Sequence, residues 1–433
     1  MHRYDLISCH DCGTLHRKRP VRPRERARCV RCSAILYRGT SADLTRVIAI
    51  TLGALLVYLI AQCCPIVEIE FSGMTSSATL VGAIRVLWSE RMQVVAVMVF
   101  LFTVLFPLVE LGALLYIALG LRAGRRLPGF HGVLRAVRTA RQWGMTEVLL
   151  IGILITIIKM TSLAKVMPQP GLFAFGALTL MLAVAMAFDP RLLWELGDKL
   201  DEASGDKPAD LTPGPGEAPG TPGLRYRAVD GKTLLACHAC GLVNRAHGRH
   251  GQRCARCGSA LHRRRPDSVS RTWALLITAA LLYIPANLLP VMYTHSLFGT
   301  EDDTIMSGVV FFWTSGSQGL AIVIFIASVA VPMLKLAVLS LLAFTTQRGS
   351  LWRLQQRTRL YRMIEFIGRW SMLDIFVVTL TVALVRFHSV AAITAGPGAL
   401  AFGCVVVLTM LASAHFDPRL MWDRVALPGD THV

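Results

Sequence analysis

The chain has 433 residues, of which 54% are hydrophobic and only 17% are charged, and its mean hydropathy is +0.52. This apolar content lies above the range of soluble globular domains, so composition argues against a string of two or three soluble domains. The net charge of +18 would suggest nucleic acid in a soluble protein, whereas a membrane protein concentrates Lys and Arg on its cytoplasmic loops.

The first predicted domain, residues 1–40, is a small metal ribbon. Its first 38 residues contain ten Lys or Arg residues and no apolar stretch typical of a secretory signal, so we expect it in the cytoplasm. Two Cys-x-x-Cys pairs lie in this segment, at Cys9, Cys12, Cys29 and Cys32. Each pair supplies one edge of a tetrahedron, so the spacing predicts a four-sulfur metal site.

Four cysteine ligands leave no open coordination position, which favours structural zinc. The alternatives are iron in a rubredoxin-like redox site, and cysteines that are unmetallated or disulfide-linked, although a reducing compartment argues against disulfides. His10 is surplus as a ligand, and we expect it to face solvent. The neighbouring basic residues are expected to meet anionic lipid or to enforce topology rather than to bind nucleic acid; they include Arg17, Lys18, Arg19 and Arg22.

Residues 41–197 form the first predicted membrane module. They contain four apolar runs of about the length that a bilayer requires, at Val47–Cys64, Val94–Gly120, Val148–Val166 and Leu172–Phe188. Residues 198–230 follow as a tether rich in Pro, Gly and acidic residues, which cannot bury a core.

The second half of the sequence repeats this order of a metal ribbon followed by a membrane module. A second zinc ribbon is predicted at residues 231–265, with Cys237, Cys240, Cys254 and Cys257 as ligands and His238 as a surplus, solvent-facing residue. The second membrane module, residues 266–425, again has four apolar runs, at Trp273–Leu289, Gly319–Phe344, Ile375–Val390 and Pro397–Phe416. The sequence therefore predicts about eight membrane helices in two tandem four-helix modules, an all-α polytopic fold.

Matching motifs establish an internal duplication with an offset near 225 residues. The shared pieces are the Cys-His-x-Cys-Gly knuckle, one proline in each of the first two helices, a Trp-x-Met-x-acid entry to the third helix and a Phe-Asp-Pro-Arg exit from the fourth. An even number of helices in each copy gives the two halves the same orientation, related by a pseudo-two-fold axis along the membrane normal.

Loop charges predict the orientation. The connection between the second and third helices carries six arginines in each copy, against a single acid, Glu365. The connection between the first and second helices carries acids instead, namely Glu68, Glu70 and Glu90 in one copy and Glu301, Asp302 and Asp303 in the other. The excess of Lys and Arg in cytoplasmic loops then places both termini and both ribbons in the cytoplasm.

Charged residues within the apolar runs are the candidate transport residues, because each costs about 2.5–3.5 kcal/mol at the centre of a membrane helix. Pro107 precedes Glu110 in the second helix, and Pro332 precedes Lys335 at the matching place in the second copy. The proline allows a kink, and the charge follows one turn later on nearly the same face. The two copies have opposite signs here, so a salt bridge across the pseudo-two-fold is one hypothesis.

The third helices begin with an acid, Glu147 or Asp374, and carry a base twelve residues later, Lys159 or Arg386. The acids are either functional or favoured by the helix dipole, and the bases either take part in transport or extend to the far membrane interface. No motif for an enzyme is present. Gly231-Lys232-Thr233 resembles the end of a phosphate-binding loop, but Tyr226 stands where that loop requires glycine.

The combination of these motifs resembles the paraquat-inducible protein A family, which includes the A subunit of the lipophilic envelope-spanning tunnel. The similarity covers the whole chain apart from the tether. It implies a Gram-negative inner-membrane protein with zinc in both ribbons, acting with a periplasmic MCE-domain protein and exchanging lipids with the tunnel that this partner forms. It also implies that Glu110, Lys335, Glu147 and Asp374 are the polar positions to examine first.

We therefore expect a lipid-trafficking membrane subunit that binds two Zn²⁺ and phospholipid, binds no nucleic acid and is not an enzyme. One alternative is a membrane redox protein whose ribbons hold iron. A second is a non-transporting membrane anchor or scaffold for the MCE partner.

Overall fold

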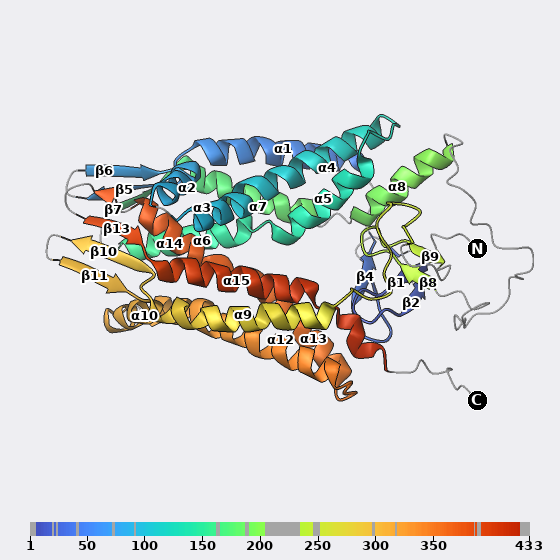
Figure 1. Ribbon diagram of the computed structural model, residues 1–433. Helices are drawn as coiled ribbons and strands as arrows, with labels where there is room; N and C mark the ends of the chain where they lie inside the picture. The colour runs from blue at the N-terminus through green and yellow to red at the C-terminus, as the bar shows by residue number, and fades with distance from the viewer. Residues whose placement is uncertain are drawn as a thin grey trace, which may run out of the picture.

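The structure of the protein is a computed structural model. It describes residues 6–19, 21–22, 25–39, 43–71, 74–90, 92–161, 165–186, 190–203, 234–245, 252–296, 299–316, 318–384, 386–387 and 391–424. Figure 1 shows an elongated bundle of roughly parallel helices, with small β-sheets at one end and the two ribbons at the other. Residues 198–203 of the predicted tether form the end of a helix, and its remaining residues, 204–230, lie outside the described part of the chain.

The two halves follow the same overall order of elements, which agrees with the duplication read from the sequence. The second half adds a 3-10 segment before its third long helix and a second strand after it, and it ends in a 3-10 segment where the first half ends in a helix. The first comprises α1 (Leu44–Cys63), β5 (Val67–Phe71), β6 (Met74–Ala78), α2 (Leu80–Ser89), α3 (Gln93–Phe100), η2 (Leu101–Leu105), α4 (Phe106–Arg122), α5 (Phe130–Trp143), α6 (Thr146–Thr161), β7 (Lys165–Pro168), α7 (Pro170–Met186) and α8 (Pro190–Ala203). The second comprises α9 (Ser268–Leu288), β10 (Met292–Ser296), β11 (Gly299–Asp303), α10 (Ile305–Thr314), α11 (Gln318–Phe325), η4 (Ile326–Ala330), α12 (Val331–Gln347), α13 (Leu354–Gly368), η5 (Arg369–Met372), α14 (Leu373–Leu384), β12 (Arg386–Phe387), β13 (Ala391–Ala395), α15 (Pro397–His415) and η6 (Pro418–Trp422).

Each of the eight apolar runs contains a helix, and the described residues hold six helical segments long and apolar enough to cross a membrane. The chain is therefore a membrane protein. The other two runs give shorter helices, α7 with 17 residues and α14 with 12. Hydropathy overestimated the third run of each copy, because its end belongs to a strand, β7 or β12. A short apolar segment does not by itself distinguish helix from strand.

Two antiparallel sheets cap the end of the bundle opposite the ribbons (Figure 1). One has the strand order β6-β5-β7, and the other has the order β11-β10-β13-β12. Five of the six acidic residues expected in loops lie on these strands, and Glu70 pairs in register with Lys165. The sixth, Glu90, is the C-cap residue of α2. The sequence did not predict the sheets, because each joins segments about a hundred residues apart.

The second helix of each copy is interrupted in the same way. A π-helical segment, η2 or η4, ends immediately before the helix that begins with Pro107 or Pro332 near its first position. Proline lacks an N–H and crowds the preceding turn, and a π-bulge accommodates both effects without breaking the helix. The predicted kink sites are thus local changes of helical winding, present in both halves.

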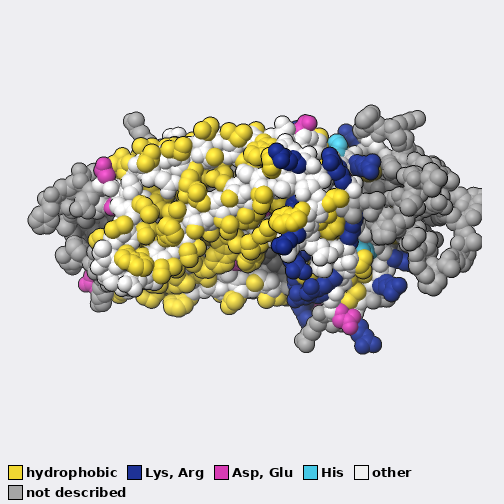
Figure 2. Space-filling model, turned by 90° about the horizontal axis from the view of Figure 1, so that it is seen from below, with side chains coloured by type: hydrophobic (Ala, Val, Ile, Leu, Met, Phe, Trp, Pro, Cys, Tyr) yellow, Lys and Arg dark blue, Asp and Glu magenta, His cyan; other side chains and the backbone are white. Residues whose placement is uncertain are grey.

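The halves meet through their third helices. α6 packs against α14, and Gly152 lets their backbones approach closely, since a Cβ atom there would lie 3.1 Å from that of Phe376. Within each half the first helix packs against the fourth, α1 on α7 and α9 on α15. Hydrophobic side chains cover the helical surface seen in Figure 2, and Lys and Arg side chains gather at the ribbon end of this apolar band.

Candidate metal centres and buried charges

Each ribbon brings its four cysteines together as predicted. β1 (Leu6–Ser8) pairs with β2 (Leu15–Arg17), and β3 (Arg26–Arg28) pairs with β4 (Ile35–Arg38) in the first ribbon; β8 (Leu234–Ala236) pairs with β9 (Val243–Arg245) in the second. The four Sγ atoms of each ribbon are buried and lie within 4.8 Å of one another. The sulfurs of Cys9 and Cys32 are 3.4 Å apart, and those of Cys237 and Cys257 are 3.5 Å apart.

These distances fit a tetrahedral metal ion. Metal–sulfur bonds of about 2.3 Å in a tetrahedral site place the sulfurs about 3.8 Å apart, so the four cysteines of each ribbon are close to the arrangement that such an ion requires. After the second cysteine of each pair the backbone turns through a left-handed residue, with φ of +75° at Gly13, +78° at Gly241 and +69° at Gly258. At the fourth such position the chain has Ser33 with φ of +58°, so only this turn lacks the favoured glycine.

A polar side chain touches one sulfur of each centre, which the sequence analysis missed. His16 Nε2 lies 3.2 Å from Cys29 Sγ, and Asn244 Nδ2 lies 3.6 Å from Cys254 Sγ. The two residues occupy the same place in the repeat, on the strand after the first knuckle. A donor at this position stabilises a thiolate ligand.

The surplus histidines differ from each other. His10 is exposed, as predicted, and lies 3.2 Å from the carboxylate of Asp11. The prediction for His238 is wrong, because its ring is half-buried and its Nε2 lies 2.9 Å from Nη2 of Arg419. Burial, reinforced by this guanidinium, lowers the pKa of His238 to about 4.

The apolar cores of the ribbons are exchanged between the halves. The first ribbon packs on the second module, where its buried residues form one cluster with Leu339, Tyr361 and Trp422. The second ribbon packs on the first module, in a cluster with Leu134 and Trp194. Each ribbon therefore covers the end of the module that belongs to the other copy.

Hydrogen bonds fix this exchange. On the first ribbon, Arg362 of α13 donates to the carbonyl of Cys32 at 2.9 Å and pairs with the buried carboxylate of Asp11. On the second, Arg138 of α5 donates to the carbonyl of Ala239 at 3.1 Å. The arginine-rich connections predicted from sequence are thus the amphipathic helices that bind the ribbons.

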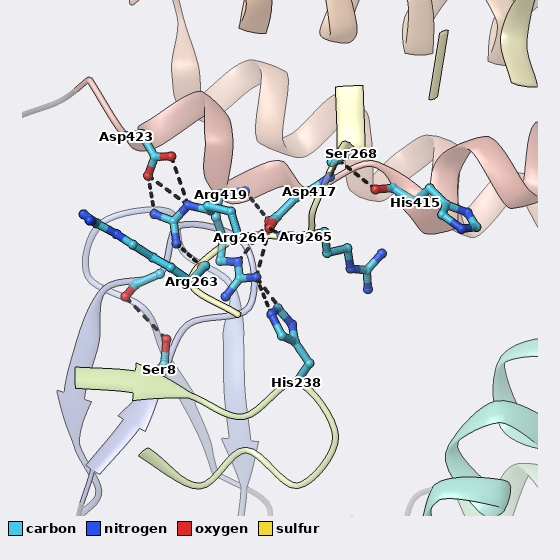
Figure 3. A network of polar contacts seen from close by, with 11 residues as sticks. Ser8, His238, Arg263, Arg264, Arg265, Ser268, His415, Asp417, Arg419 and Asp423 are labelled. Atoms are coloured by element: carbon cyan, nitrogen blue, oxygen red, sulfur yellow. Dashed lines mark hydrogen bonds and ion pairs between the residues drawn. The ribbon is translucent and has the colours of Figure 1, made fainter. Parts of the chain in front are cut away.

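The Phe-Asp-Pro-Arg motif ties each ribbon back to its own half. Figure 3 shows Asp417 beside Arg419 and His238. The Asp417 carboxylate accepts hydrogen bonds from Nε and Nη2 of Arg419, both at 2.9 Å, and Nη2 also lies within hydrogen-bond distance of the His238 ring. Asp417 further accepts the N–H of Arg265, and its own N–H donates to Ser268. Burial alone would raise the pKa of Asp417, but the guanidinium of Arg419 and the backbone N–H groups of Arg265 and Arg419 hold it below the usual range. In the first half, Arg191 donates to the carbonyl of Leu36 at 2.8 Å.

The two buried charges have different partners. Glu110 is 4% exposed and accepts the Nε of Arg141 at 2.9 Å, and Arg141 also donates to the carbonyl of Ala185. Lys335 is fully buried and donates to three oxygens, the carbonyl of Gly368 at 3.3 Å and the hydroxyls of Ser371 and Thr409 at 3.1 Å.

The hypothesis of a salt bridge between Glu110 and Lys335 is therefore wrong, since each is satisfied within its own half. The sequence pattern indicated Arg141 only as a loop charge. Aligning Trp143 with Trp370 places Arg141 opposite Gly368, and this difference could have indicated that the two halves supply their cation from different helices.

The remaining candidates are less informative. Glu147 is exposed in the first turn of α6, where a carboxylate suits the helix dipole. Asp374 and Lys159 belong to α14 and α6, and Arg386 belongs to β12, but their side chains lie outside the described part of the structure.

These features define a polytopic membrane protein built from two tandem modules, with two four-cysteine centres at one end. A family model described as "Paraquat-inducible protein A" matches residues 44–197 and 269–426, so the chain belongs to that family. It is 31% identical to "Intermembrane transport protein PqiA" of Escherichia coli K12 over 98% of this chain and 97% of that protein.

Two further relatives match over similar lengths. "Lipophilic envelope-spanning tunnel protein A" of Escherichia coli K12 is 31% identical over 97% of this chain and 92% of its own length. "Probable intermembrane transport protein" of Haemophilus influenzae is 29% identical over 97% of this chain and 96% of its own. These names describe transport proteins rather than enzymes. No solved structure matches.

Proposed function

We propose that this protein is an inner-membrane subunit of a lipid-trafficking system, which exchanges lipids between the membrane and a periplasmic tunnel formed by an MCE-domain partner. The observation that carries the proposal is the similarity along the whole chain to proteins named for intermembrane transport and for a lipophilic envelope-spanning tunnel. The charge distribution favours the ribbons, and with them both termini, on the cytoplasmic side.

In this arrangement the two end sheets face the periplasm. They present the acidic strands β5 and β11 to that compartment, with Glu68, Glu70, Glu301, Asp302 and Asp303. Sheet edges are frequent binding surfaces for extended segments of a partner. The sheets are therefore where we expect the periplasmic partner to dock.

We assign zinc to both ribbons. Four thiolates close a tetrahedral site, and each ribbon has too few residues to build an independent core. The bound ions would hold the knuckles in the shape that packs on α5 or α13. Iron fits the same four sulfurs, so metal analysis decides between the structural and the redox interpretation.

Lys335 and the Glu110–Arg141 pair are the proposed transport residues, supported by the burial of Lys335 and Glu110 within the membrane part of the chain and by the ion pair between Glu110 and the partly buried Arg141. Buried ionisable groups in membrane helices are expensive and are typical of substrate or ion pathways. Glu147, Asp374, Lys159 and Arg386 remain candidates at the ends of the third helices. Pro107 and Pro332 would set the winding that positions Glu110 and Lys335.

The test is affinity purification of the full chain from native membranes in mild detergent, with protein, lipid and metal analysis of one sample. The proposal expects an MCE-domain protein, enriched phospholipid and about two zinc ions per chain. Iron in the ribbons without partner or lipid would replace it with the redox function. A partner without lipid, retained when Lys335 is neutralised with no loss of function, would instead indicate a scaffold.

A further inference from the structure

A cleft of about 300 Å³ lies where the two halves meet at the ribbon end of the bundle. The last turn of α5 forms one wall, through Arg141, Gln142 and Trp143. α13 and the last turns of α15 form the other, with Arg362, Glu365 and Ala414 among the lining residues. Its volume is at the lower end of the range for small-molecule sites, which suits one polar headgroup rather than a whole lipid.

The cleft is rich in charge and yet balanced. Among the described side chains, its lining contributes the cations Arg141 and Arg362 and the carboxylate Glu365. The charged groups bonded directly to that lining include Glu110, Asp11 and Lys335. Together these are three positive and three negative groups. Such a site offers local contacts to ligand groups of both signs.

The apolar part of the lining fits the remainder of a lipid. Trp143 and Met410 line the walls, and Phe366 is 58% exposed beside them. The cleft lies at the ribbon end of the bundle. On the face seen in Figure 2 the apolar surface gives way at this end to Lys and Arg, as at the membrane–water interface of a membrane protein.

We propose that this cleft binds the headgroup of a glycerophospholipid that carries both a phosphate and a primary amine. The phosphate lies against the guanidinium groups of Arg141 and Arg362, which match its oxygens, and the ammonium lies against Glu365. The acyl chains leave past Phe366 into the membrane. This inference rests on the proposed lipid-transport function and names the substrate class and the place of entry on the ribbon side.

The experiment measures lipid retention by the full chain. Purified protein in mild detergent is mixed with equal amounts of phosphatidylethanolamine and phosphatidylglycerol, and retained lipid is counted by native mass spectrometry. We expect one phosphatidylethanolamine to be kept in preference. Glu365→Gln should lower its retention about tenfold, the effect of losing one charge-assisted contact, and leave phosphatidylglycerol unchanged.

Two further variants sharpen the result. Ala414→Trp fills the cleft without changing charge and should reduce the retention of both lipids. Arg359→Ala removes an exposed arginine from α13 outside the lining and is the matched control that should change nothing. Metal content and melting temperature verify folding. If the Ala414→Trp protein does not fold, the retention measured for Glu365→Gln, a change at an exposed residue, tests the inference by itself.

Equal retention of the two lipids, or retention unaffected by Glu365→Gln, would overturn the inference. If lipid and partner still co-purify in that case, the proposed function stands and the headgroup binds elsewhere. If neither lipid nor partner is found with the unaltered chain, the proposed function itself fails.

Discussion

Lys335 of the second half donates to the carbonyl of Gly368, the residue that corresponds in the repeat to Arg141, the partner of Glu110 in the first half. Each half thus has a cation at the end of the connection between its second and third long helices, but the cation comes from a different helix in each half. One half uses an acid on the second helix and an arginine at the end of α5. The other uses a lysine on the second helix and a glycine that leaves room for it, since a Cβ at Gly368 would lie 3.3 Å from Lys335 Cε.

The first prediction concerns the Glu110–Arg141 pair. Glu110→Gln should destabilise the protein by about 3–5 kcal/mol, because it leaves a buried guanidinium without its counter-charge. Glu110→Lys should be worse, since it adds a second cation. The double change Glu110→Lys with Arg141→Gly copies the second half and should recover part of the loss. Melting temperature in detergent measures each; strict additivity of the two single changes would contradict the coupling.

The second prediction separates structure from transport at Lys335. The partners of Lys335 in the described part of the chain are neutral, and the hydroxyls of Ser371 and Thr409 also donate to backbone carbonyls, so removing its charge leaves no unpaired buried charge. Lys335→Met should therefore keep the melting temperature within a few degrees and yet abolish lipid transfer in reconstituted vesicles. Thr409→Val, which removes one of three acceptors, is the graded comparison. Full transfer by the folded Lys335→Met protein would remove this residue from the mechanism.

The third prediction tests the exchanged ribbons by metal removal. Cys9→Ser should loosen the first ribbon and raise hydrogen exchange in α13 and η6 of the second module. Cys237→Ser should instead raise exchange in α5 and α8 of the first module. Each ribbon contributes to a cluster with those elements, so the pattern must cross between halves. Increased exchange confined to the ribbon's own module would disprove the arrangement.

The fourth prediction follows from the depressed pKa of Asp417. A carboxyl with a folded-state pKa below its unfolded value of about 3.9 contributes stability above that value and loses it as pH falls through the folded pKa. Asp417→Asn should therefore lower stability by about 2 kcal/mol at pH 7, through weaker bonds to Arg419. The difference from the unaltered chain should shrink below about pH 4. A difference independent of pH would show that the charge is immaterial.

The sequence predicted those features of the protein that depend on residues close together in the chain. Cysteine spacing identified the two groups of four cysteines that could hold a metal ion, because a Cys-x-x-Cys turn fixes two sulfurs through a few backbone angles. Apolar length located every long helix, because a bilayer imposes that length. The duplication was visible in matched motifs, and the prolines marked the two π-helical segments.

Other features required contacts between distant segments. The end sheets join β5 to β7 and β10 to β13, and no local pattern predicts such a partner. The position of His238 depends on Arg419, 181 residues away, which the histidine's own neighbourhood does not indicate.

The sequence by itself determined the two four-cysteine groups, the membrane helices and the repeat, because each follows from chemistry within a few turns of chain. Only the tertiary structure decided that each ribbon covers the opposite module, and that Glu110 and Lys335 are satisfied separately. Both outcomes depend on which buried surfaces fit one another. That choice belongs to the packing of the whole bundle, since a ribbon too small to bury its own core and a charge removed from water must each find a partner wherever the fold provides one.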